Sequence, residues 1–232
     1  EAMKIGFGTL QWSADISFPE DKQKQSKFTP ILEWLMTIFA IVFAYGVSQR
    51  PVHNFDMIGY TASVYSLNGL SGQALLDRTY SDVRAEVSSE KFNALTTGSR
   101  YRTTVFTDHL ALEQQLPFYS IRVIYVYAAD LIGKLIGSVS MATWIISTVS
   151  SFLIIVGIGL FFLKTLELPF FIALPIIISL SIFDVARLST PDSLTILIGL
   201  IGLLTYKRYN NFYAMFFIAI LPLFRTDYLL LS

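Results

Sequence analysis

The segment that decides the fold is residues 31–48, ILEWLMTIFAIVFAYGVS, which runs almost directly into residues 50–60, RPVHNFDMIGY. The first part is an apolar run of membrane-spanning length, because a transmembrane helix needs about 20 predominantly apolar residues. The second part places an arginine, a histidine and an aspartate just beyond that run. Such side chains at the end of a membrane helix can carry out chemistry at the bilayer surface, or they can be ordinary loop polarity.

The composition of the whole chain indicates a membrane protein. Of its 232 residues, 53% are hydrophobic and 15% are charged, whereas soluble domains are about 25% charged. The net charge is zero, which argues against a nucleic-acid partner. The absence of cysteine excludes disulfides and cysteine-based metal sites. These features predict an all-α fold, a polytopic transmembrane helix bundle with a large outer loop that contains short amphipathic helices.

The apolar runs divide the chain into four regions. Residues 1–30 are polar and carry lysines before the first span, which favours the cytoplasmic side for this segment. Residues 31–48 are the first transmembrane helix. Residues 49–116 form the outer loop, where apolar residues at helical spacing over 57–67 predict an amphipathic helix in the headgroup region. Residues 117–232 form the rest of the bundle, and the apolar end of the chain predicts a truncated C-terminus.

The expected membrane topology contains a conflict. Spans are expected at about 118–137, 138–163, 168–183, 193–206 and 212–224. The basic pair Lys207-Arg208 should be cytoplasmic, and because one span separates it from residues 184–192, those residues should lie on the outer face. However, three apolar runs lie between the outer loop and residues 184–192, and three full spans would place residues 184–192 on the cytoplasmic side. One run therefore does not cross, and we expect it to be 168–183, which is short and contains two prolines. The alternatives are that run 118–137 is the exception, or that Lys207-Arg208 lies outside.

Asp56 is the first candidate for chemistry. The simpler interpretation is that it caps the N-terminus of the helix that begins after it. The functional interpretation is a general base, or a metal ligand, at the edge of the membrane. Arg50 is suited to bind a phosphate through two parallel hydrogen bonds. His53 is either a surface imidazole or part of the same site.

The polar break at residues 184–192 is the second candidate. Charges at membrane depth are costly, so they usually face a cavity or one another. Asp184 and Arg187 therefore either form an interfacial ion pair, with Asp192 capping the following helix, or line the same polar cavity as Asp56. Arg225 reaches the same face in the expected topology.

Three motifs together resemble a known family. They are residues 54–60 (NFDMIGY), residues 115–119 (QLPFY), and residues 189–194 (STPDSL) followed by a span, a basic turn, a second span and residues 224–227 (FRTD). This pattern is similar to the N-terminal part of GT-C-type glycosyltransferases, polytopic membrane enzymes that take sugars from polyprenyl-phosphate carriers. The resemblance covers most of residues 31–228. The chain departs from the family pattern because Asp56 lacks a neighbouring second acid, and because residues 115–119 contain one proline and follow no lysine.

The resemblance implies transfer of a sugar from a polyprenyl-phosphate-linked donor to an acceptor at the outer membrane face. It implies a multi-pass cell-envelope enzyme of the bacterial inner membrane, with the lipid-linked donor and membrane lipids as partners. Asp56 is then the catalytic base and a candidate ligand for a divalent cation, Mg²⁺ or Mn²⁺. The implied substrate-binding residues are Arg50, His53, Tyr60, Arg100, Arg102, Arg187, Asp192 and Arg225.

Two other functions stay open, part of a transporter or flippase and a non-catalytic subunit of polysaccharide assembly. Arg122 and Asp130 inside an apolar run and a proline-broken helix are typical of carriers, whereas the large outer loop and the absence of an internal repeat argue against one. Arg122, Asp130 and Lys134 share one helix face, and their simplest interpretation is a structural stripe of ion pairs.

Overall fold

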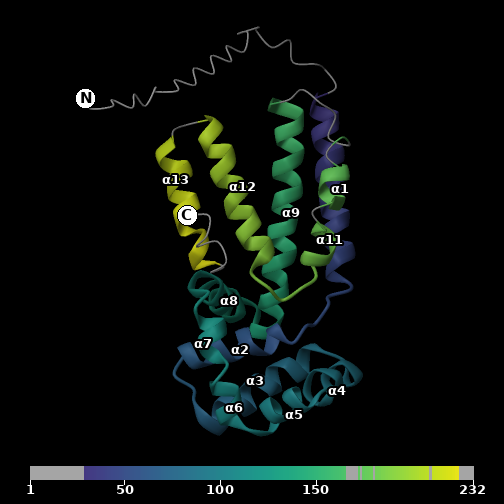
Figure 1. Cartoon of the computed structure of the whole chain (residues 1–232). Coiled ribbons are helices and arrows are strands. Elements are labelled where there is room, and N and C mark those ends of the chain that lie inside the picture. Colours follow the sequence, from purple (N-terminus) through teal and green to yellow (C-terminus); the bar gives the residue numbers. More distant parts are fainter. Residues whose placement is uncertain (1–28, 166–171, 173, 180, 209–210, 225–232) are drawn as a thin grey trace, which may run out of the picture.

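The structure, a computed structural model, describes residues 29–165, 172, 174–179, 181–208 and 211–224. Every regular element in these ranges is helical, and their one β-type contact is an isolated parallel bridge between Val52 and Leu188. The prediction of an all-α fold is therefore confirmed. The helices form two layers, a bundle of long apolar helices and a layer of short helices beneath it (Figure 1).

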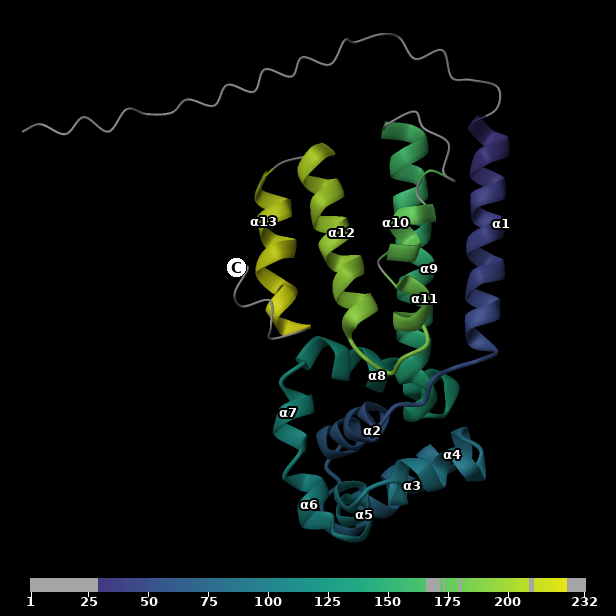
Figure 2. The same ribbon diagram turned by 45° about the vertical axis from the view of Figure 1, so that its right-hand side comes forward.

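The bundle contains α1 (Thr29–Ser48), α9 (Val139–Thr165), α12 (Asp192–Arg208) and α13 (Asn211–Ile220), and the short α10 (Leu174–Ser179) and α11 (Ile182–Val185) run beside α9 (Figure 2). Its core joins Ala40 of α1, Ile154 and Ile155 of α9, Ile177 of α10 and Ile182 of α11. Within the described ranges, Ile31–Ser48 and Val139–Phe162 are the two helical segments long and apolar enough to cross a bilayer.

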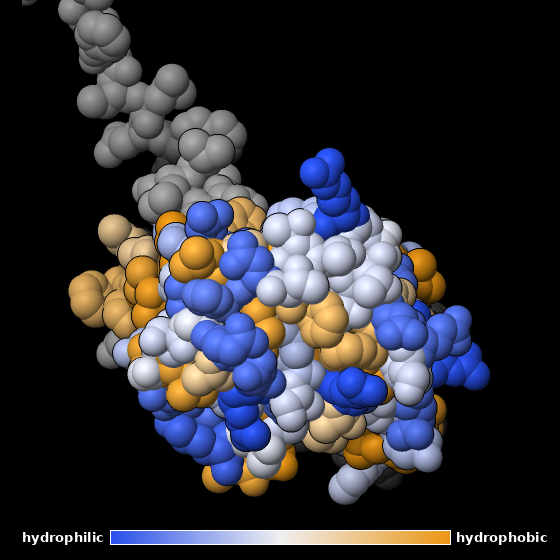
Figure 3. Space-filling model, turned by 90° about the horizontal axis from the view of Figure 1, so that it is seen from below, coloured by the Kyte–Doolittle hydropathy of each residue, from blue (hydrophilic) through white to orange (hydrophobic). Residues whose placement is uncertain are grey.

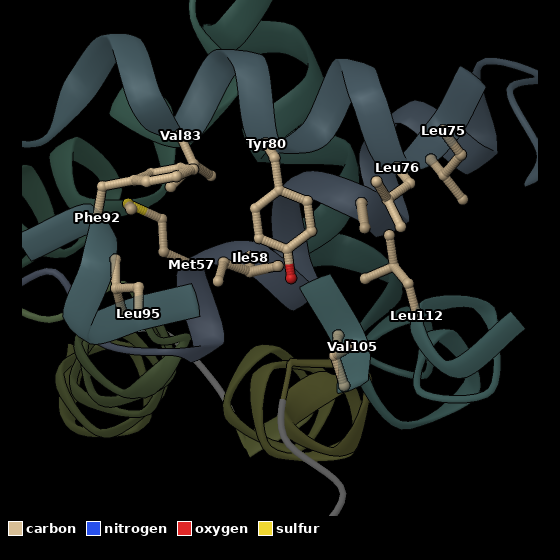
Figure 4. Close-up of a cluster of buried hydrophobic side chains, with 11 residues drawn as sticks. Met57, Ile58, Leu75, Leu76, Tyr80, Val83, Phe92, Leu95, Val105 and Leu112 are labelled. Atoms are coloured by element: carbon tan, nitrogen blue, oxygen red, sulfur yellow. The ribbon is translucent and has the colours of Figure 1, made fainter. Parts of the chain in front are cut away.

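The lower layer is built from α2 (Asp56–Leu67), α3 (Gly72–Glu86), α4 (Ser89–Thr97), α5 (Arg100–Thr107) and α6 (His109–Glu113). Met57 and Ile58 of α2 lie among Tyr80, Leu95 and Leu112 from the surrounding helices (Figure 4). Fully burying side chains of this kind contributes roughly 1.5–3 kcal/mol each. Polar side chains spread over the face that looks away from the bundle (Figure 3).

This core corrects the expectation for residues 57–67. They do form a helix, but residues 57–64 are all buried. The helix is covered on one side by α3 and on the other by α7 (Leu116–Ser120) and α8 (Val123–Ile136). It is the central helix of the lower layer, and its apolar residues face protein rather than lipid headgroups.

Run 118–137 does not form one long helix. It contains most of α7 and all of α8, and α8 lies across the base of the bundle (Figure 2). With 14 residues, α8 is about 21 Å long, less than the roughly 30 Å of a hydrocarbon core. Gly137 ends α8 with φ +83°, a conformation that glycine adopts without steric cost. The described helices of 168–183, α10 and α11, run along α9 (Figure 2).

Asp82 of α3 connects the two layers, because its carboxylate caps the N-terminus of α9. The Asp82 side chain accepts hydrogen bonds from the backbone N–H groups of Val139 and Ser140, both at 3.0 Å, and from the Ser138 hydroxyl at 2.9 Å. One turn further along α3, Glu86 accepts a 2.8 Å hydrogen bond from the Trp144 indole. Two acidic side chains of the lower layer thus hold the first turns of the longest helix.

The polar loop before α12 docks onto the lower half of α9 through small hydroxyl side chains. Ser147 donates to the Thr190 carbonyl and Thr148 to the Ala186 carbonyl, each at 2.9 Å. The hydroxyls of Ser151 and Ser193 are also 2.9 Å apart. These contacts fix residues 186–193 at the junction of the two layers, where the segment after α1 also lies.

Candidate functional site

Asp56 is the first residue of α2 and lies at the junction of the two layers. Asp56 does not cap the helix. The N-cap residue is Phe55, and no side chain there accepts a hydrogen bond from the first turn. Instead, one Asp56 carboxylate oxygen accepts a 2.8 Å hydrogen bond from the Asn54 amide, and the other accepts a 3.2 Å hydrogen bond from the Tyr119 hydroxyl. Both partners are neutral, so the carboxylate is held in place by dipoles rather than by an ion pair.

The position of Tyr119 depends on a glycine in α2. A Cβ atom on Gly59 would collide with the Tyr119 ring, so only glycine allows the ring to lie against α2 at this point. The ring also packs edge-on against Tyr60, with centroids 5.0 Å apart. Tyr60 is 2% exposed. It therefore supports Tyr119 from within the core, and the sequence-based expectation that Tyr60 contacts a substrate does not fit its burial.

Asn54 joins the segment after α1 to the loop before α12. Its amide nitrogen donates to Asp56, and its amide oxygen accepts a 3.2 Å hydrogen bond from the Ser189 N–H. Val52 donates a 2.9 Å backbone hydrogen bond to the Arg187 carbonyl, which is part of the isolated parallel bridge. Two loops that are far apart in the sequence therefore meet next to Asp56, which agrees with one of the two interpretations that the sequence left open.

Arg50 and Arg187 are part of this junction. The Arg187 Nε donates a 2.6 Å hydrogen bond to the Arg50 carbonyl, and its guanidinium lies over the Phe183 ring at 5.3 Å. Asp184 is exposed, and no ion pair between Asp184 and Arg187 is found among the described residues. Asp192 accepts a 3.1 Å hydrogen bond from the Thr190 hydroxyl.

Arg122 lies at the same junction, which the sequence analysis missed. It is the N-cap residue of α8, and its guanidinium lies over the Phe118 ring at 4.8 Å and the Tyr60 ring at 5.8 Å. Its Nε is buried and has no hydrogen-bond partner in the described part of the chain. The predicted stripe is wrong for this residue. In the part of the chain that the structure describes, Asp130 forms its ion pair with Lys134, at 2.6 Å, and accepts a hydrogen bond from Asn68 rather than from Arg122.

The electrostatic environment raises the pKa of Asp56. Burial is the main cause, because it disfavours the charged carboxylate. Hydrogen bonding from Tyr119 and the positive charge of Arg122 oppose it, and the negative charge of Asp192 adds to it. In contrast, burial and the charge of Lys91 lower the pKa of His53. Asp56 is thus a carboxyl group of increased basicity. His53 is a neutral imidazole at neutral pH, and its Nδ1 is buried without a hydrogen-bond partner among the described residues.

Three predicted site residues, Arg100, Arg102 and Arg225, remain to be placed. Arg102 of α5 stacks over the Phe55 ring at 5.5 Å and donates a 2.7 Å hydrogen bond to the Ala94 carbonyl, so it packs against the residue before Asp56. Arg100 is exposed on α5. Arg225 falls outside the described residues. Within the described ranges, no group of three or more His, Cys, Asp or Glu side chains lies close enough to hold a metal ion.

A cavity of about 490 Å³ lies between α2, α7 and α8, separate from Asp56. Its walls are mainly apolar, and serines of α2 and α7 add hydroxyl groups. It is lined by Ser63, Ser66, Leu67, Glu113, Leu116, Pro117, Ser120, Val123, Val126 and Tyr127. Leu116, Pro117 and Ser120 flank Tyr119 in sequence, so one wall of the cavity is the short helix that also supplies the Asp56 partner.

Comparison with known proteins gives no family for this chain. No family model, no curated protein and no solved structure matches it. The resemblance to GT-C-type glycosyltransferases therefore rests on the short motifs of the sequence.

Proposed function

We propose that the chain is part of a multi-pass membrane glycosyltransferase that takes a sugar from a polyprenyl-phosphate-linked donor. The observation that carries the proposal is Asp56, a half-buried carboxylate of raised pKa where apolar helices meet a polar layer. A general base works best when its pKa is near the operating pH, and burial moves Asp56 in that direction. The motif resemblance supports the same residue.

The two-layer arrangement supports a membrane location. The exposed side chains of α1 include Leu35, Ile38, Ile41 and Val42, each more than half exposed, as expected for a helix surrounded by lipid. In our proposal, α1, α9, α12, α13 and the pair α10–α11 lie in the bilayer of a bacterial inner membrane. The lower layer lies at the outer face and carries Asp56 at its upper surface.

In the proposed reaction, Asp56 removes the proton from an acceptor hydroxyl as that oxygen forms a bond to the anomeric carbon of the sugar. The bond between the anomeric carbon and the phosphate oxygen breaks, and polyprenyl phosphate leaves with the electron pair. Arg122 supplies positive charge close to Asp56 and stabilises the leaving phosphate. If a divalent cation takes part, Asp56 is the residue that would hold it.

A carrier is the second candidate function, and one observation favours it. The segment beside α9 is broken between α10 and α11, where Ser181 has φ +50°, a strained conformation for a residue other than glycine. Broken helices in a bundle are typical of carriers. Transport of a labelled lipid-linked sugar across vesicles without sugar transfer would favour this function over the transferase.

The direct test is sugar transfer by the purified protein in lipid nanodiscs. Polyprenyl-phosphate-linked hexoses and pentoses are supplied with lipid, glycan and peptide acceptors, and released polyprenyl phosphate is measured by mass spectrometry. We expect release with at least one donor, and we expect no sugar to be transferred to the acceptors from a nucleotide-linked sugar. A folded protein that releases polyprenyl phosphate from none of the donors would contradict the proposal.

Tyr119→Phe is expected to shift the acidic limb of the pH–rate profile of sugar transfer to higher pH. The Tyr119 hydroxyl hydrogen-bonds the ionised Asp56 and lowers its pKa, so its removal raises that pKa further. Since the base acts when deprotonated, a higher pH is then needed for the same rate. The pH dependence of the transfer rate measures the shift. Tyr127→Phe, an exposed tyrosine of α8, is the control and should leave the limb in place.

A further inference from the structure

The outer surface of α8 carries a continuous apolar stripe. Val123, Tyr127, Leu131 and Leu135 follow one another at every fourth position, and their side chains are 43%, 56%, 63% and 78% exposed. At 1.5 Å per residue the stripe is about 18 Å long. Phe118 and Ile121, 63% and 51% exposed, extend it at the α7 end. A patch of this size on a protein surface marks a contact with another apolar phase.

The opposite surface of α8 is buried against other helices of the protein. Tyr125, Val126 and Ala129 are at most 4% exposed and pack in one cluster with Tyr60 of α2 and Ile146 of α9. The helix therefore cannot rotate to bury the stripe without losing this cluster. Its outward apolar surface is a fixed property of the fold.

The border of the stripe has the chemistry of a membrane interface. Lys134 and Asp130 form an ion pair along one edge, and the Lys134 side chain is 61% exposed. Arg122 lies at one end of the helix, and Tyr127 lies within the stripe. Lysine and arginine reach towards headgroups along their apolar stems, and aromatic rings are enriched at this depth. A water-facing helix would not expose four large apolar side chains in line.

The level of α8 in the molecule agrees with this chemistry. It lies across the base of the bundle, between the ends of the apolar helices and the polar lower layer (Figures 1 and 2). The exposed apolar surface of α13, which includes Met215, Phe216 and Ile218, lies directly above this level. The α8 stripe thus lies directly below the level of the α13 surface that we propose faces the lipid acyl chains.

We infer that α8, with the end of α7, is a membrane-surface helix whose stripe lies among the headgroups and upper acyl chains of the bilayer. The inference rests on the membrane location proposed above, but not on any enzymatic activity. It gives the Asp56 site a fixed depth, because Tyr119 and Arg122 come from α7 and from the start of α8.

Site-specific spin labelling tests this inference directly, because the chain contains no native cysteine. Single cysteines are placed at Leu131 and Leu135, and the labelled protein is reconstituted into vesicles of phosphatidylethanolamine and phosphatidylglycerol. Collision rates with oxygen, which partitions into lipid, and with a nickel chelate, which stays in water, are measured. Val42→Cys on α1 is the lipid control, and Glu90→Cys on α4 is the water control.

The expected result is a higher ratio of oxygen to nickel collisions at Leu131 and Leu135 than at Glu90, close to the ratio at Val42. Nickel collisions at Leu131 and Leu135 that equal those at Glu90 would place the stripe in water and overturn the inference. Low collision rates with both reagents would show that protein covers the stripe, which also overturns it. A water-like ratio at Val42 would instead overturn the membrane location itself.

Discussion

Asp56→Asn is expected to reduce sugar transfer by about 10²–10⁴-fold, the usual contribution of a general base. The substitution keeps the shape of the side chain and removes its ability to take a proton. The Tyr119 hydroxyl can still donate to the remaining amide oxygen. The new NH₂ group would face the Asn54 amide nitrogen, which now donates to Asp56, so a local loss of about 1 kcal/mol is expected from that hydrogen bond.

The loss of activity must be separated from this loss of stability. Initial rates are measured at saturating donor and acceptor, and thermal unfolding is followed on the same samples. Asp77→Asn is the matched control, because Asp77 is an exposed carboxylate of α3 that accepts a hydrogen bond from Gln73. We expect Asp77→Asn to keep full activity, and Asp56→Asn to be folded but inactive. Retained transfer in Asp56→Asn would remove Asp56 from the mechanism.

The apolar runs of the sequence were enough to predict helices, but not which of them form one long helix. Run 118–137 has the composition of a span, yet it turns at residues 121–122 and stops at Gly137. Hydropathy cannot distinguish one long apolar helix from two shorter helices of the same composition, because it does not register where the chain turns. The difference is set by tertiary packing, here of Tyr125 and Ala129 against α2 and α9.

Tertiary packing also decides which residues of the candidate site could be predicted from the sequence. The pairing of Asp56 with the loop at 184–192 was one of two interpretations that the sequence left open. The structure joins the two segments through Asn54 and Ser189. Arg122 was assigned to a stripe with Asp130 because the two are eight residues apart, a helical spacing. The stripe requires an unbroken helix, and Arg122 precedes the first residue of α8 with ψ 60°. The break turns its guanidinium away from Asp130 and over Tyr60 and Phe118.

Placing Tyr119 and Arg122 beside Asp56 has a mechanical consequence. Both residues belong to the α7–α8 segment, whereas Asp56 belongs to α2, and both α2 and α8 pack against α9. Asp82 and Glu86 add hydrogen bonds between the lower layer and the start of α9. We therefore expect the orientation of the lower layer, and with it the geometry of the site, to depend partly on these two side chains.

Asp82→Ala is accordingly expected to destabilise the protein by on the order of 3 kcal/mol. The side chain is 8% exposed and accepts hydrogen bonds from the Tyr65 hydroxyl at 3.0 Å and from three groups at the start of α9. Loss of a helix cap costs about 0.5–2 kcal/mol, and each buried donor left unsatisfied adds about 1–3 kcal/mol unless water reaches it. A decrease of roughly 6–12 °C in Tm follows for a chain of this size.

Thermal unfolding in nanodiscs, followed by circular dichroism, measures the decrease. Asp77→Ala on the same helix is the control and should change stability by no more than about 0.5 kcal/mol, because exposed substitutions have small effects. Asp82→Asn should fall between the two, since its amide oxygen can still accept from the α9 backbone while the negative charge near the positive end of the helix dipole is lost. If Asp82→Ala unfolds like the control, the lower layer is held by its apolar contacts alone. The depth and orientation of the Asp56 site would then be set by the packing of α2 and α8 rather than by the capped start of α9.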